Sequence, residues 1–109
     1  MTKRILNFIG LINRAGALIT GTDMVLSGVR SGKVKFVLIN NEVSANTLKK
    51  VTDKCNYYDI SYLVMPTEAD LGSAIGKDSR KVIGITEQHF VKALKEKLEK
   101  ETTKTGGSA

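Results

Sequence analysis

The chain has 109 residues, of which 41% are hydrophobic, and this size predicts one domain with a modest core. Seventeen Lys and Arg residues stand against 11 Asp and Glu, so the net charge is +6 and the isoelectric point is about 9.6. The one cysteine, Cys55, excludes an intrachain disulfide and a cysteine metal cluster, and this is typical of the reducing cytoplasm. No apolar run approaches the roughly 20 residues that a membrane-spanning helix needs, so no membrane partner is expected.

The positive charge is concentrated in one half of the sequence. Residues 1–55 carry nine basic and three acidic side chains, whereas residues 56–109 carry eight of each. A basic face of this kind suits a polyanion such as a nucleic acid. A chance imbalance spread around the surface explains the same numbers equally well.

The hydrophobic pattern predicts helices and strands that alternate along the chain. The predicted helices cover residues 3–14, 22–31, 45–56, 67–76 and 87–100, and the predicted strands cover 17–20, 34–39, 60–65 and 81–86. Such alternation is typical of the α/β class and predicts a three-layer α/β/α sandwich around a small sheet of about four strands.

One of these strands and the end of the chain give further expectations. The strand 34–39 is apolar except for Lys35, which is the pattern of a strand buried on both faces, so we expect it in the middle of the sheet. Residues 1–101 are expected to form a single domain. Residues 102–109 are polar and rich in glycine, and we expect them to be a disordered tail.

The stretch 14–32 carries the clearest functional signal. Gly16 is placed to end the first helix in the left-handed conformation, and a short strand then leads directly to Gly21-Thr22-Asp23, which opens the second helix. Free backbone N–H groups at such a helix start are a favourable site for phosphate. Helix capping alone also explains these residue types.

Signals of catalysis are weak. The one histidine, His89, cannot complete a catalytic triad or a histidine metal site, so no enzyme activity, cofactor or small-molecule substrate is expected. The segment 72–79 resembles a phosphate-binding loop but has three residues between its glycines instead of four, and Asp78 instead of Ser or Thr after the lysine.

Two groups of side chains have alternative interpretations. The tyrosines at positions 57, 58 and 62 either stack on bases or belong to the core beside a strand. The lysines of helix 45–56 form either a phosphate-contacting face or an ordinary solvated face.

Several motifs in a fixed order resemble one known family. They are Gly10-Leu11, Arg14-Ala15-Gly16, Gly21-Thr22-Asp23-Met24-Val25, the strand 34–39, Asn46-Thr47-Leu48-Lys49-Lys50, Asp53-Lys54-Cys55 and Leu71-Gly72-Ser73-Ala74-Ile75-Gly76-Lys77. Over roughly residues 5 to 98 the chain resembles the family of large-subunit ribosomal proteins seven-Ae and thirty-e, and within it a bacterial branch of YlxQ type. The resemblance implies a non-catalytic cytoplasmic protein that binds structured RNA, such as rRNA, and possible association with the ribosome.

The resemblance also implies which residues contact RNA. The family typically binds a kink-turn, a sharply bent RNA helix with tandem sheared G·A pairs, through two elements. The first element corresponds to Gly21, Thr22, Asp23, Met24 and Ser27, and the second to Met65, Pro66 and Thr67. For an RNA-binding protein we also expect contacts to the RNA backbone from Arg14, Arg30, Lys33 and Lys35.

Three residues of the first element depart from the family pattern. Asp23 stands in place of Asn, Met24 in place of Glu, and Ser27 in place of Lys. An ionised aspartate cannot donate a hydrogen bond, and a thioether is a weak acceptor compared with a carboxylate. The alternative hypothesis is therefore a protein-interaction module on the same fold, with little or no RNA binding.

Overall fold

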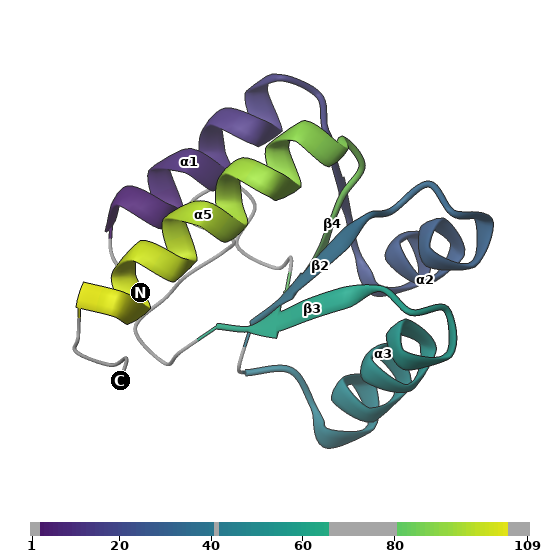
Figure 1. The fold of residues 1–109 in the computed structure, drawn as a ribbon. Helices are drawn as coiled ribbons and strands as arrows, with labels where there is room; N and C mark the ends of the chain where they lie inside the picture. Colours follow the sequence, from purple (N-terminus) through teal and green to yellow (C-terminus); the bar gives the residue numbers. More distant parts are fainter. Residues whose placement is uncertain (1–2, 41, 66–80, 105–109) are drawn as a thin grey trace.

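The computed structural model describes residues 3–40, 42–65 and 81–104. Its elements follow the chain as α1 (Lys3–Arg14), β1 (Leu18–Thr20), α2 (Thr22–Ser31), β2 (Phe36–Ile39), α3 (Ala45–Tyr57), β3 (Ser61–Val64), β4 (Val82–Ile85) and α5 (Gln88–Lys104) (Figure 1). Helices and strands alternate over most of this order, as the hydrophobic pattern predicts.

The four strands form one mixed sheet in the order β1-β4-β2-β3. Strand β2 is parallel to β3, with Phe36 opposite Ser61, and antiparallel to β4, with Phe36 opposite Ile85. Strand β4 is also antiparallel to β1. The predicted central position of the strand within residues 34–39 is therefore confirmed.

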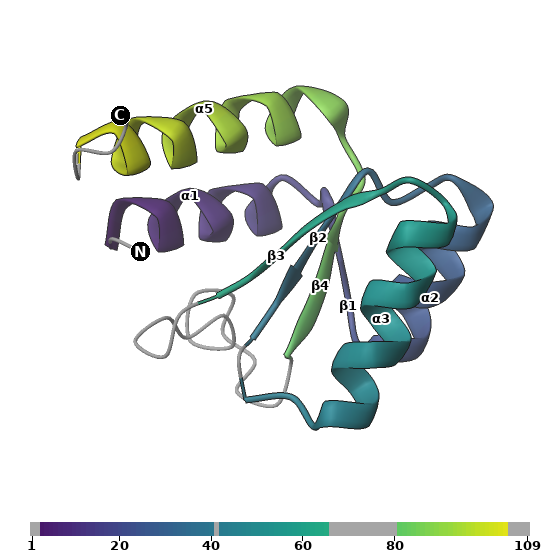
Figure 2. The same cartoon turned by 60° about the horizontal axis from the view of Figure 1, so that its bottom comes forward.

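Helices cover both faces of the sheet. Helices α1 and α5 lie side by side on one face, and α2 and α3 lie on the other (Figure 2). Alternate residues of β2 point to the two layers: Phe36 and Leu38 pack in the core beneath α1 and α5, whereas Val37 and Ile39 pack beneath α2 and α3. This arrangement is the predicted three-layer α/β/α sandwich, and it explains why β2 lacks the polar alternation of a half-exposed strand.

Some predicted boundaries differ from the structure. Val34 and Lys35 precede β2 instead of belonging to it, and Val34 is fully buried, where it would contact a Cβ placed on either Gly28 or Gly84. Helix α5 continues to Lys104, so the first residues of the expected tail are helical. The predicted helix 67–76 and residues 105–109 lie outside the described residues.

One end of the sheet brings together segments that are far apart in the sequence. Strands β1, β2 and β3 end here and β4 begins here, and we call this end the carboxyl edge. Backbone bonds join its segments: the Gly21 N–H donates to Val82 O (3.0 Å), and the Asn40 N–H donates to Lys81 O (2.7 Å). Because α2 follows β1 directly, the start of α2 lies at this edge.

Candidate functional site

The start of α2 is held by a glycine in an unusual backbone conformation. Gly21 is the N-cap residue, with φ 99° and ψ 142°, a region that side chains strongly disfavour. The first backbone hydrogen bond of the helix runs from the Val25 N–H to Gly21 O (2.9 Å), and no side chain caps the helix. The N–H groups of Thr22, Asp23 and Met24 therefore stand before the first helical bond and are available to a ligand.

Helix α3 begins near the same edge but differs at its N-terminus. The Ser44 hydroxyl accepts a hydrogen bond from the Thr47 N–H (3.1 Å) and donates to Thr47 Oγ1 (3.0 Å). This is an ordinary N-cap that satisfies an orphan N–H group. Of these two helix starts, α2 is the one without a side-chain cap, and anion binding at this start stays a prediction.

None of the three residues in the first turn of α2, Thr22, Asp23 and Met24, is a cation. Asp23 and Met24 are exposed, Met24 to 62%, and Thr22 is half-buried. A carboxylate in the first turn interacts favourably with the positive end of the helix dipole. Asp23 therefore stabilises the helix but also adds negative charge where an incoming phosphate would approach.

Sequence reasoning missed two residues of the carboxyl edge. Asn40 is 6% exposed, and its Oδ1 accepts a hydrogen bond from the Glu42 N–H (3.0 Å), which shapes the loop that leads to α3. Lys81 is exposed and immediately precedes Val82, the residue that holds Gly21. Lys81 comes close to the start of α2 because β4 pairs with β1, and this long-range pairing leaves no signal in the local sequence.

The second predicted RNA-contacting element needs a correction. Met65 is 1% exposed and packs in the core cluster beneath α1 and α5, so its side chain does not form an apolar wall at the surface. Its N–H donates to Ile39 O (2.7 Å), which continues the pairing of β3 with β2. Pro66 and Thr67 lie outside the described residues.

Three of the predicted backbone-contacting cations lie far from the start of α2. Arg14 is the last residue of α1, on the other face of the sheet, and Lys33 and Lys35 follow the C-terminus of α2. The ten residues of α2 place its two ends about 15 Å apart. These three cations therefore lie away from the Gly21 turn, and their contact with an RNA backbone stays a prediction.

Lys35 has a local role instead. Its Nζ donates a hydrogen bond to Gly32 O (2.9 Å), at the residue that ends α2 in the left-handed conformation with φ 82°. A cation at a helix C-terminus interacts favourably with the carbonyl groups and the dipole there. This contact explains Lys35 without a ligand.

The two other predicted residues, Ser27 and Arg30, lie together in a groove between α2 and α3. The groove has a volume of about 290 Å³ and is lined by Leu26, Ser27, Arg30, Lys50 and Lys54. Arg30 and Ser27 therefore share a surface with two lysines of α3. This position is further along α2 than its open start.

Two side chains have shifted pKa values. The carboxylate of Asp53, through a hydrogen bond and its charge, raises the pKa of Lys49. Burial raises the pKa of the Cys55 thiol to about 11, so this thiol stays protonated at neutral pH and is a poor nucleophile.

Within residues 3–40, 42–65 and 81–104, no group of His, Cys, Asp and Glu is arranged to hold a metal ion. Over the same ranges, no helix combines the length and apolar character required to cross a membrane.

The sequence of this chain is similar to a known protein family and to individual proteins. The sequence profile of the "Ribosomal protein L7Ae/L30e/S12e/Gadd45 family" matches residues 3–95. The chain belongs to this family. It is 44% identical over 86 residues to the "RNA-binding protein YlxQ" of Bacillus subtilis (strain 168), covering 79% of this chain and 86% of that protein. It is 42% identical over 97 residues to the protein of the same name from Enterococcus faecium, covering 89% and 93% of the two chains.

Two solved structures share the fold of this chain. A Bacillus halodurans protein of unknown function has a TM-score of 0.81 and 36% identity, covering 87% of this chain and 96% of that one. The Giardia lamblia 15.5kD RNA binding protein has a TM-score of 0.75 at 18% identity, with 91% of each chain covered. The second likeness concerns the fold, and it supports the α/β/α arrangement of this family member.

Proposed function

We propose that this protein is a non-catalytic RNA-binding protein that recognises structured RNA of the kink-turn type through the open start of α2. The observation that carries the proposal is the uncapped helix start at Gly21, which directs free N–H groups to a ligand at the carboxyl edge. The names of the Bacillus subtilis and Enterococcus faecium relatives support RNA as the ligand. We further propose that the protein acts in the cytoplasm on rRNA or another structured RNA, and that it associates with the ribosome.

The departures at Asp23, Met24 and Ser27 define how this binding differs from the usual family pattern. Base recognition by these side chains is weakened, so phosphate neutralisation contributes a larger share of the free energy of binding. We therefore expect affinity to fall steeply between about 50 and 200 mM salt, with a slope set by the number of phosphate contacts. An RNA affinity that stays constant over this range would count against phosphate contacts and favour the alternative, an apolar surface for a protein partner.

The decisive experiment compares two glycines with positive φ at opposite ends of β1. Gly21 has φ 99° and lies at the proposed site, whereas Gly16 has φ 74° and follows α1 at the other end. A valine strains the backbone at either position. Gly21→Val is expected to weaken binding to a kink-turn RNA at least tenfold, about 1.4 kcal/mol, and Gly16→Val is expected to leave the affinity unchanged.

The RNA needs its own control, which is the same molecule with its tandem G·A pairs replaced by Watson–Crick pairs. Weaker binding of this control RNA to the wild-type protein supports recognition of the kinked shape. Circular dichroism of each variant checks that the domain remains folded at the assay temperature. Equal effects of Gly21→Val and Gly16→Val would exclude the helix start as the RNA site and favour the protein-interaction alternative.

A further inference from the structure

The groove between α2 and α3 carries three cationic side chains. Arg30 comes from α2, and Lys50 and Lys54 come from α3. The two helices pack against each other on the same face of the sheet and both begin near the carboxyl edge (Figure 2). None of the described residues that line the groove is aromatic, so these residues offer charge and a hydroxyl group and no stacking surface.

The charges in the groove are not balanced by protein groups. Among the described residues, Arg30, Lys50 and Lys54 make no ion pair and no side-chain hydrogen bond. Two like charges at a spacing of four on a helix, as Lys50 and Lys54 are, destabilise it slightly. An anion bound in the groove would remove this repulsion.

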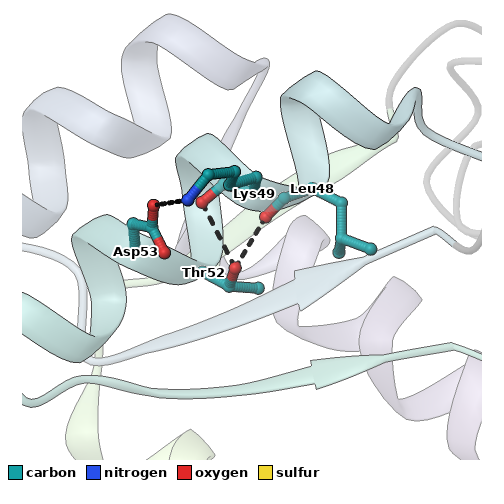
Figure 3. Close-up of polar contacts among 4 residues, drawn as sticks. All are labelled: Leu48, Lys49, Thr52 and Asp53. Carbon is teal, nitrogen blue, oxygen red and sulfur yellow. Dashed lines mark hydrogen bonds and ion pairs between the residues drawn. The ribbon is translucent and has the colours of Figure 1, made fainter.

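Lys49, the neighbour of Lys50 in the sequence, differs from the groove lysines because it has a carboxylate partner. Lys49 is outside the groove, and its Nζ lies 2.9 Å from Asp53 Oδ2, one turn further along α3 (Figure 3). Asp53 therefore neutralises Lys49 and leaves the groove lysines without a carboxylate. In the same helix segment, Thr52 Oγ donates to Leu48 O (2.8 Å), a local contact that offers no charge to the groove.

Two residues that line the groove, Ser27 and Arg30, lie on the same side of α2 as Asp23 in its first turn. Asp23, Ser27 and Arg30 are spaced at i, i+4 and i+7, which places them along one side of the helix. Arg30 lies eight residues after Thr22, a rise of about 12 Å along the helix axis. One phosphate cannot reach both the open N–H groups and the groove, whereas a polynucleotide strand can.

We propose that the α2/α3 groove binds the phosphodiester backbone of an RNA helix whose kinked part occupies the start of α2. This inference rests on the proposed function and adds a second, non-sequence-specific contact to it. Arg30 binds a phosphate with two parallel N–H groups, and Lys50 and Lys54 act as point charges on adjacent phosphates. The groove thereby supplies the cations that the start of α2 lacks.

The test uses a kink-turn RNA with long flanking helices and measures the salt dependence of its affinity. In the groove variant Arg30→Gln/Lys50→Gln/Lys54→Gln, we expect the log–log salt slope to fall by two to three, about one for each phosphate contact. The matched control is Arg4→Gln/Lys92→Gln/Lys95→Gln, which changes the net charge equally at exposed positions of α1 and α5, outside the groove. Its slope should remain that of the wild type.

A conservative variant separates charge from packing. Lys50→Arg/Lys54→Arg keeps both cations and should retain the wild-type slope. If the triple glutamine variant is less stable than the wild type, this result attributes its smaller slope to the lost charges. A groove variant with an unchanged slope would overturn the groove contact, while a loss of binding in Gly21→Val would still support the proposed function. Absence of wild-type binding to this RNA would overturn both.

Discussion

The layer formed by α2 and α3 has two sides with opposite properties. On its inner side, four side chains are at most 1% exposed, namely Val25, Val29, Val51 and Cys55. On its outer side lies the groove with Arg30, Lys50 and Lys54, and some of these are sequence neighbours of the buried residues, as Lys54 is of Cys55. The inner side fixes the spacing of the two helices, and the outer side carries the charge. Stability and ligand binding should therefore respond to different substitutions.

The largest effect on stability alone is expected at Gly28, on the inner side of α2. A Cβ at this position would lie 2.5 Å from Val34 Cγ2, and Val34 is itself fully buried. Alanine gains about 1 kcal/mol of helix propensity over glycine, but the overpacking costs about 1–3 kcal/mol. We expect Gly28→Ala to lower the free energy of unfolding in a urea titration and to leave RNA affinity unchanged.

The Val34→Ala variant provides the control for this prediction. In the double variant Gly28→Ala/Val34→Ala, the smaller side chain makes room for the new methyl group. Because the two residues are in contact, their effects should be non-additive by about 0.5–3 kcal/mol. Additive changes in the free energy of unfolding would contradict the proposed clash.

The next effect concerns binding alone, at the outer side near the start of α2. The double variant Met24→Glu/Ser27→Lys introduces the family's residue types at two exposed positions. The glutamate can accept hydrogen bonds from base edges, and the lysine adds a cation beside Arg30 in the groove. We expect the affinity for a kink-turn RNA to rise about tenfold, or 1.4 kcal/mol, as measured by titration.

Stability should hardly change in this variant, because exposed substitutions usually alter it by about 0.5 kcal/mol or less. The single variants show which residue is responsible. Ser27→Lys should steepen the salt slope, and Met24→Glu should increase the preference for RNA that retains its G·A pairs. Equal affinity of all three variants and the wild type would indicate that RNA does not approach this side of α2.

Features encoded within a few residues were predictable from the sequence. The bounds of α2, the left-handed glycine at 16 and the opening of α2 at Gly21 depend on local backbone preferences, and the structure agrees with them. The three layers followed from the alternation of elements, and the central position of β2 followed from its continuous apolar run.

Features that depend on tertiary pairing were not predictable in this way. The burial of Met65 results from the pairing of β3 with β2, and the meeting of Arg30 with Lys50 and Lys54 requires that α2 and α3 are neighbours. The lysines of α3 gave a partial signal, since Asp53 is placed to pair with Lys49 and not with Lys50. Which helix they face cannot be read from local spacing.

The smallest expected effect tests whether Lys35 belongs with the groove cations or stabilises α2. Its hydrogen bond to Gly32 O places its charge at the C-terminus of the helix, where cations typically contribute about 0.3–1 kcal/mol. Lys35→Met keeps most of the aliphatic stem, so we expect it to lower the free energy of unfolding by about that amount. The salt slope for RNA binding should stay at the wild-type value, because Lys35 does not line the groove and its Nζ is bonded to Gly32 O. A slope reduced by about one, with stability unchanged, would instead place Lys35 on the RNA backbone, as the sequence-based hypothesis expects.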